Sequence, residues 1–274
     1  MINSLDAESV RAPISGLPRE QLDSLEVFPE IESTNSYLLD QPAPMPGRFR
    51  VALADHQTAG RGRRDRQWQS PGLSGVCLSM SYTFAKKPPM LSCLTLAIGV
   101  GVIQSLERLG VRGIGLKWPN DLIARDRKLG GILTEVRPAI SDKVTIVTGI
   151  GINYDLRNAS DPAVLMTGLG AAIDLAAAMR ELPSRSLVAT ILIEGLFNVL
   201  ADFDAHGFSD FADAWERYDW LRGQRISVDA ADRIVTGICQ GIDDDGALIL
   251  QTDAGRQRIL SGSIIFHGQK EGRP

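Results

Sequence analysis

The sequence predicts an α+β protein: a mixed, largely antiparallel sheet with packed helices, followed by a small β-barrel at the C-terminal end. Two observations predict the larger part. Short apolar runs divided by turn residues are typical of a meandering sheet, and two longer segments carry apolar residues at helical spacing. A third observation predicts the barrel, because the chain changes near residue 222 to short strands separated by tight turns.

Size and charge limit the possible functions. The chain has 274 residues, of which 44% are hydrophobic and 23% charged, which suits one large domain and a small one. With 29 basic and 33 acidic side chains its net charge is −4. No diffuse positive field is therefore available to hold a polyanion, and any anion must be bound locally.

The cysteines and the apolar segments indicate the compartment. Cys77, Cys93 and Cys239 are far apart and form no CxxC pair, which favours reduced cytosolic thiols over a disulfide framework or a zinc site. The chain does not begin with a basic region leading into an apolar one, and the apolar run near residues 94–103 is shorter than a bilayer span. We expect a cytoplasmic protein with no membrane association.

The first third of the chain contains an arm, a helix and three strands. Residues 1–24 are polar and broken by Pro13, Gly16 and Pro18, so we expect a flexible arm. The pattern then predicts, in order, a strand at 27–28, a helix from Ser33 or Thr34 to Leu39, and strands at 50–54 and 75–82. An Arg-Gly stretch forms the long loop between the last two strands.

The rest of the chain alternates helices and strands. A helix is predicted from Leu91 to Leu109, because its apolar residues recur at helical spacing and Gly110 stands at a stop position. A second helix covers residues 186–202. The predicted strands are 115–118, 122–124, 131–136 and 144–152 in the large domain, and 225–228, 233–240, 247–252 and 256–260 in the small one.

The stretch TAGRGRRDRQWQS, residues 58–70, carries the most distinctive chemistry. Gly60 and Gly62 let the backbone approach a phosphate closely, and the neighbouring guanidinium groups bind oxyanions in bidentate fashion. The spacing matches neither a Walker loop nor a dinucleotide fingerprint, and Arg-Gly stretches also occur in nucleic-acid-binding tails. Trp68 and the strand-rich flanks favour a ligand lid, with an RNA-binding or repressor module as the non-enzymatic alternative.

Four further stretches, taken with this loop, resemble a known family. They are ESTN at 32–35, KWPNDL at 117–122, RKLGGIL at 127–133 and GIGIN at 149–153. In this order and spacing they resemble the catalytic domain of biotin protein ligases, or biotin-[acetyl-CoA-carboxylase] ligases. The resemblance covers roughly residues 25–270, because GQRISV and CQGIDDDGALIL resemble the SH3-like barrel that ends those enzymes.

The resemblance implies a division of the chain and a two-step reaction. The implied parts are an arm at 1–24, a class II synthetase-like catalytic domain at 25–221, an SH3-like domain at 222–270 and a tail at 271–274. Biotin and ATP are the implied substrates, which form biotinyl-5′-AMP with the help of Mg²⁺. The biotinyl group then passes to a lysine of a biotin carboxyl carrier domain of acetyl-CoA carboxylase or a related carboxylase.

The residues that match the family's motifs fall into three sets. Positive charge must offset the repulsion between a carboxylate and a phosphate, and the implied catalytic residues are Lys128, Arg63 and Arg61. The biotin-side set is Ser33, Thr34, Asn35, Gln57, Gly60, Arg61, Arg63, Lys128 and Gly131. The nucleotide-side set is Arg61, Arg63, Arg66, Trp68, Asn120, Lys128 and Asn153.

Two regions are expected to complete the nucleotide side. Asp121 is the first choice as a ligand or outer partner of Mg²⁺, which prefers carboxylate oxygens. Residues 154–168 are expected to cover the adenosine, with Leu156, Val164 and Leu165 offering apolar surface. The acidic run at 243–245 is most simply a solvated turn.

Two departures from the family pattern carry expectations of their own. Asp65 stands where many members have glycine, and we expect it to pair with Arg64 and Arg66 and so pre-order the loop. The residues before Val27 are too few for the winged-helix domain of the bifunctional repressors, so we expect a monofunctional ligase that binds no specific DNA. The sequence leaves the choice between monomer and homodimer open.

A lipoate ligase or octanoyltransferase of related fold is the alternative enzyme. It also uses a lysine beside an acyl group. The GRGRR and KWPND stretches and the small C-terminal domain count against it.

Overall fold

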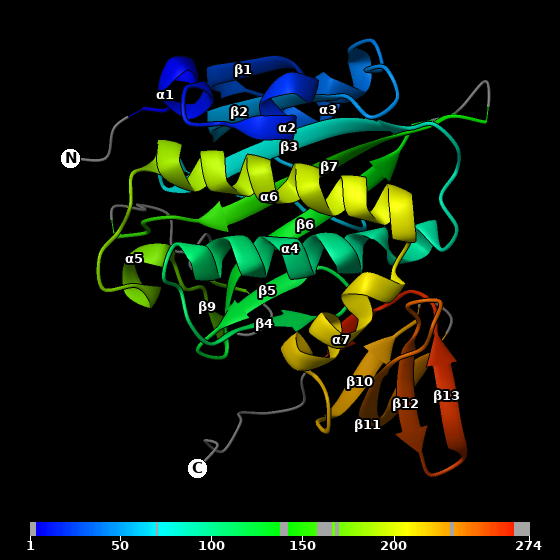
Figure 1. The fold of residues 1–274 in the computed structure, drawn as a ribbon. Helices are drawn as coiled ribbons and strands as arrows, with labels where there is room; N and C mark the ends of the chain where they lie inside the picture. Colours follow the sequence, from blue (N-terminus) through cyan, green and yellow to red (C-terminus); the bar gives the residue numbers. More distant parts are fainter. Residues whose placement is uncertain are drawn as a thin grey trace.

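The computed structural model describes residues 4–69, 71–137, 142–157, 166–167, 170–230 and 233–265. A seven-stranded sheet forms the large domain, and a five-stranded sheet forms the small one (Figure 1). The large sheet has the strand order β1 (Leu22–Ile31), β2 (Phe49–Gln57), β3 (Gly75–Phe84), β7 (Val144–Asn153), β6 (Arg127–Val136), β5 (Asp121–Ala124), β4 (Ile114–Lys117). Only the β1–β2 pair among the described strands is parallel, so the predicted mixed, largely antiparallel sheet is confirmed.

The centre of the large sheet is covered on both faces. All ten residues of β3 are buried, and large apolar side chains alternate along the strand with small or hydroxyl-bearing ones. Helices α4 (Leu94–Arg108) and α6 (Arg185–His206) lie across one face, as Figure 1 shows. Helix α3 (Thr34–Asp40) packs with Ala52 and Val147 in a separate apolar cluster.

The two long helices approach each other closely because small residues stand at their crossing. A side chain at Gly101 would collide with Val199, and one at Gly195 would collide with Ser105. Two helical segments, Leu91–Arg108 and Arg185–His206, are long and apolar enough to cross a membrane, but 67% and 56% of their most apolar windows are buried inside the protein. Their apolar faces are thus used in the core of the domain.

The N-terminal residues differ from the expected flexible arm. Helices α1 (Ala7–Arg11) and α2 (Gly16–Gln21) form there, and Leu5, Val10 and Ile14 are buried in the main core. The carbonyl of Val10 accepts a hydrogen bond from Thr190 Oγ1 of α6 at 2.9 Å. Burial of these apolar side chains against α6 stabilises the segment, and β1 begins at residue 22 rather than 27.

Shorter elements complete the large domain. They are the 3-10 turn η1 (Leu91–Cys93), the strands β8 (Met166–Thr167) and β9 (Gly170–Ala171), and the helices α5 (Leu175–Ala178) and α7 (Ser209–Tyr218). Helix α7 leads directly into the small domain.

The small domain is an antiparallel sheet with one strand more than predicted. Its order is β13 (Gly255–Ile259), β12 (Leu248–Thr252), β11 (Ile234–Ile242), β10 (Arg225–Asp229), β14 (Ser263–Ile265). Strand β14 is only three residues long and has no alternating pattern of its own, so the sequence does not reveal it. It pairs with β10 from Ser227 to Asp229.

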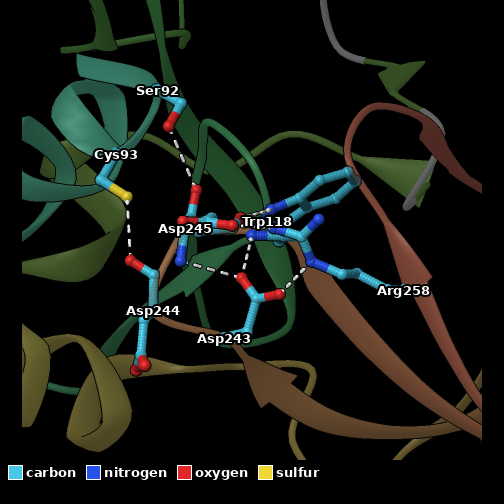
Figure 2. A network of polar contacts seen from close by, with 9 residues as sticks. Ser92, Cys93, Trp118, Asp243, Asp244, Asp245 and Arg258 are labelled. Atoms are coloured by element: carbon cyan, nitrogen blue, oxygen red, sulfur yellow. Dashed lines mark hydrogen bonds and ion pairs between the residues drawn. The ribbon is translucent and has the colours of Figure 1, made fainter. Parts of the chain in front are cut away.

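The acidic run at residues 243–245 connects the two domains and is not simply a solvated turn (Figure 2). The indole of buried Trp118 donates to Gly246 O at 3.0 Å, and Ser92 Oγ donates to Asp245 O at 3.2 Å. The Asp243 carboxylate accepts from the backbone of Ala247 at 2.9 Å and pairs with Arg258. The carboxylates shape the turn, and its backbone carbonyls contact the large domain.

Replacement of Gly246 by alanine should weaken this contact. The residue has a φ of +78°, and a Cβ would lie 2.9 Å from Leu96 Cδ1 and 3.0 Å from Cys93 Sγ. Gly223 is a matched control, because its φ is +76° and a Cβ there meets nothing within 4 Å. We predict that the free energy of unfolding falls by about 1 kcal/mol in Gly223→Ala and by about 2 kcal/mol or more in Gly246→Ala. Urea unfolding measures both, and equal losses would show that the turn is not tightly docked.

Candidate functional site

A cavity lies between the large sheet, the Arg-Gly loop and β14 of the small domain. It brings together most residues that the sequence analysis placed at the site. The lining includes Ser33, Thr34, Asn35, Gln57, Arg61, Arg63, Arg66, Trp68, Asn120, Asp121, Lys128 and Gly131. Gly60 and Asn153 are not part of the described lining.

A buried hydrogen-bond network forms one end of the cavity. Ser33 caps α3 by accepting from Ser36 N at 3.3 Å, which confirms the expected capping role. Thr34 donates from its backbone N to Gln57 Oε1 at 2.8 Å. Its hydroxyl lies 2.7 Å from Ser79 Oγ, and Ser79 Oγ donates to Asn35 Oδ1 at 2.6 Å. Pre-set polar groups of this kind suit a ligand end that both donates and accepts.

Ser79 is a member of this network that the sequence analysis missed. It lies in the middle of β3 and is fully buried. Hydroxyl residues in a buried strand are a signal, because a buried hydroxyl needs a partner, but Ser81 and Thr83 on β3 carry the same signal and the sequence does not single out Ser79.

An ion-pair cluster forms the other end. Asp121 accepts from Lys117 Nζ at 2.5 Å and from Lys128 Nζ at 2.7 Å. Asn120 donates to Ile132 O at 2.7 Å, and its Oδ1 lies 3.5 Å from Arg63 Nη1. The β4–β5 turn and the start of β6 therefore place an aspartate, an asparagine and two lysines within one small region.

The cavity is strongly positive although the chain is acidic. Its described lining has six cationic side chains, Arg61, Arg63, Arg64, Arg66, Lys117 and Lys128, and one acidic side chain, Asp121. Burial lowers the pKa of the Arg63 guanidinium, and Arg64 and Arg66 lower it further, while Asp121 acts in the opposite direction. A positive charge that is both desolvated and repelled by its neighbours attracts an anionic ligand strongly.

The charge state of Asp121 depends on the two lysines. Burial alone raises the pKa of this carboxyl, but Lys128 and Lys117 outweigh burial and hold the pKa below its usual value. Asp121 therefore stays ionised and keeps both ammonium groups in place. Lys128 Nζ also lies 5.9 Å from the centre of the Trp68 ring, a distance suited to a cation–π contact.

The Arg-Gly loop is folded back over the sheet as a small hairpin. Arg61 bridges Gln67, and Gly62 N donates to Arg66 O at 2.7 Å. At its tip Arg64 and Asp65 have φ values of 53° and 58°, in the left-handed region where glycine is at ease and aspartate is tolerated.

The tip of the loop contacts the small domain. Arg64 Nη1 and Arg66 Nη2 each donate to Ser263 Oγ at 3.3 Å. The expected pairing of Asp65 with these arginines does not occur within the described residues. Ser263 is a second contact that the sequence analysis missed, because it depends on how the two domains are docked.

Trp68 occupies the middle of the cavity wall. A side chain at Gly151 of β7 would collide with the indole ring of Trp68, so this glycine leaves the space that the ring occupies. Asn35 covers Gly149 in the same way, two residues earlier on the same face of β7. The Trp68 N–H is buried and has no hydrogen-bond partner in the described part of the chain. Such a group is suited to a polar atom of a ligand.

The remaining predicted residues have mainly structural contacts. Asn153 donates to Ile173 O at 3.0 Å and so links β7 to the segment before α5. A Cβ at Gly60 would collide with Trp68 O, so this glycine lets the hairpin close. Leu156 is buried, and its backbone N donates to Asp174 at 2.6 Å. Val164 and Leu165 lie outside the described residues.

The donor set at Asp121 does not fit a protein-held metal. Each of its oxygens is already paired with an ammonium group. In the described part of the chain, no group of three or more histidine, cysteine, aspartate or glutamate side chains could hold a metal ion.

Comparison with known proteins gives a consistent result along the chain. The model of the biotin/lipoate A/B protein ligase family matches residues 27–153, and the model of the biotin protein ligase C-terminal domain matches residues 222–267. The bifunctional ligase/repressor BirA of Escherichia coli is 35% identical over 92% of this chain and 77% of its own length. The biotin–[acetyl-CoA-carboxylase] ligase of Mycobacterium tuberculosis is 30% identical over 96% of each chain.

Solved structures agree with these matches. The biotin protein ligase of Aquifex aeolicus in complex with biotin and ATP is similar with a TM-score of 0.70 and 26% identity, covering 89% of this chain and 97% of that one. A point mutant of the same Aquifex aeolicus enzyme, in complex with biotin, has a TM-score of 0.73 and the same 26% identity, covering 88% of this chain and 98% of that one.

The Asp121 cluster gives a pH-dependent prediction. A carboxyl whose folded-state pKa is depressed adds stability above its unfolded-state pKa of about 3.9, and this stability is lost as the pH falls through the folded-state pKa. Asp121→Asn should lower the free energy of unfolding by about 3 kcal/mol at pH 7, because two ammonium groups lose their partner. The difference in free energy of unfolding between the wild type and this variant should become smaller below about pH 4.

Urea unfolding at a series of pH values measures this difference, with Asp253→Asn at an exposed turn as the control. An equal loss of stability in the control, or no loss in Asp121→Asn at pH 7, would contradict the assigned role of Asp121.

Proposed function

This chain belongs to the biotin protein ligase family, and we propose which of its residues carry out the family's reaction. The enzyme activates biotin with ATP to biotinyl-5′-AMP and transfers the biotinyl group to a lysine of a carrier protein. The observation that carries the proposal is a cavity that combines a neutral hydrogen-bonding end with a cationic end. The lipoate alternative is not favoured.

The ends of the cavity suit the two ends of biotin. Along one face of β7, Asn35 covers Gly149 and Trp68 covers Gly151, while Lys128 lies beyond the Trp68 ring. We assign the ureido ring to the network of Thr34, Asn35 and Gln57, which offers donors and acceptors. The acyl chain then runs along the Trp68 surface and brings the carboxylate to Lys128.

The cationic end suits the first chemical step. A biotin carboxylate oxygen attacks the α-phosphorus of ATP, and the bond from that phosphorus to the bridging oxygen breaks, so that pyrophosphate leaves. Both reactants are anionic, and charge shifts to the leaving group. Lys128 and Arg63 are placed to offset this repulsion and the developing charge.

The second step needs the mixed anhydride to survive until the carrier arrives. The acceptor lysine attacks as a neutral amine at the acyl carbon, AMP leaves, and the amine loses a proton. The Arg-Gly hairpin, which lies over the cavity and contacts Ser263, is suited to keep water away from the adenylate.

Several further assignments complete the proposal. Any Mg²⁺ is held mainly by the phosphates of ATP, because both oxygens of Asp121 are engaged by lysines. The acceptor is a biotin carboxyl carrier domain of acetyl-CoA carboxylase or a related carboxylase, and the reaction takes place in the cytoplasm. The catalytic part ends near residue 221, where the small domain begins.

Pyrophosphate release tests this function directly. With ATP, the enzyme should release pyrophosphate in the presence of biotin and not in that of lipoate or octanoate. Lys128→Ala and Arg63→Ala should each lower the rate about 100-fold or more, since each removes a charge that the transition state uses.

Arg256→Ala is the matched control for these variants, because Arg256 is an exposed arginine on β13 that does not line the cavity. Its activity should equal that of the wild type. Equal release with lipoate, or full activity of both cavity variants, would contradict the proposal.

A further inference from the structure

Arg61, at the base of the hairpin, does not point its guanidinium at the other cations of the cavity. Its Nη2 donates to Glu135 Oε1 at 2.6 Å and its Nη1 donates to Glu135 Oε2 at 3.1 Å. This is a bidentate pair, the geometry that gives arginine and carboxylate their strongest contact. Glu135 lies on β6, 74 residues away in sequence, and its side chain is 22% exposed.

Glu135 has a second partner at the hydrogen-bonding end of the cavity. Asn35 Nδ2 donates to Glu135 Oε2 at 2.9 Å, while Asn35 Oδ1 accepts from Ser79. Asn35 is buried and is held against Gly149, so its amide has little freedom to turn. The same carboxylate therefore contacts the loop and the proposed biotin pocket.

These contacts form one continuous path. It runs from Arg61 through Glu135, Asn35 and Ser79 to Thr34, whose backbone N donates to Gln57, and the hydrogen bonds along it are 2.6 to 2.9 Å long. Hydrogen bonds in such a chain polarise and orient one another. A ligand that binds Thr34 or Gln57 thus contacts a network that ends on the loop.

We infer that Glu135 is a positioning residue that fastens the Arg-Gly hairpin to the biotin pocket through Arg61 and Asn35 and so slows the escape of the adenylate. The inference rests on the proposed function, since the adenylate is its product. Glu135 does not line the described cavity, so it acts through Arg61 rather than by touching the substrate.

The opposite role is also testable. Glu135 could instead compete with the adenylate phosphate for Arg61, in which case its removal would free a guanidinium for the ligand. The two roles predict opposite changes in one rate constant, the dissociation of biotinyl-5′-AMP from the enzyme.

The test uses the full chain and the variants Glu135→Gln and Glu135→Ala. Glutamine keeps the size of the side chain and an oxygen for Asn35, but it removes the charge that pairs with Arg61. The enzyme is loaded with biotin and ATP, and dissociation of biotinyl-5′-AMP is followed at low salt and at about tenfold higher salt, where surface charges are well screened. Glu30→Gln is the matched control, because Glu30 is an exposed carboxylate on β1 outside this path.

We expect dissociation from Glu135→Gln to be about fivefold faster than from the wild type at low salt. Salt should speed dissociation from the wild type more than from this variant, because the half-exposed ion pair is screened and the variant lacks it. Glu135→Ala, which also leaves Asn35 without its partner, should in addition raise the KM for biotin. Glu30→Gln should behave as the wild type.

Two other results would overturn the inference. Slower dissociation from Glu135→Gln would show competition for Arg61, and an unchanged rate with unchanged salt dependence would show that Glu135 has no role in retention. A wild-type enzyme that makes no biotinyl-5′-AMP would overturn the proposed function itself, and the two failures are thereby distinguished.

Discussion

The ion pairs of Asp121 with Lys117 and Lys128 hold the cationic end of the site in place. Six cationic side chains line one cavity. Arg61 is paired with Glu135, and the other five would repel one another without a counter-charge. Asp121 holds Lys117 and Lys128 at 2.5 and 2.7 Å, and it does so from the start of β5, where the sheet fixes its position. Asp121 and Glu135 neutralise only part of the charge of these six side chains, so the cavity keeps an excess of positive charge for two anionic substrates.

The sheet provides the second constraint. Glycines at positions 149 and 151 leave the face of β7 bare, and Asn35 and Trp68 fill the space that side chains would take. Asn35 lies in α3, after β1, and Trp68 lies in the loop between β2 and β3, so the cavity wall is assembled by chain segments that the sheet brings together. The small domain contributes the last part, because its 243–246 turn docks on Trp118 and its Ser263 reaches the tip of the hairpin.

Much of the fold and of the candidate site could be predicted from the sequence, and the parts that could not have physical causes. The central strands, α4 and most of the cavity lining follow from periodicity and from collinear motifs. Leu5, Val10 and Ile14 could not be predicted as core residues, because the surface that buries them belongs to α6, far along the chain. Ser79 and Glu135 lie outside the motifs and gain their partners only through sheet register. The docking of the acidic turn depends on backbone carbonyls, which no side-chain pattern reveals.

The most direct test of the central claim is a crystal structure of the enzyme with biotin and a non-hydrolysable ATP analogue. We expect Lys128 Nζ and the Arg63 guanidinium to lie within hydrogen-bond distance of the biotin carboxylate or the α-phosphate, with the ureido ring at Thr34 and Gln57. A complex in which Lys128 and Arg63 point into solvent, away from both ligands, would contradict it.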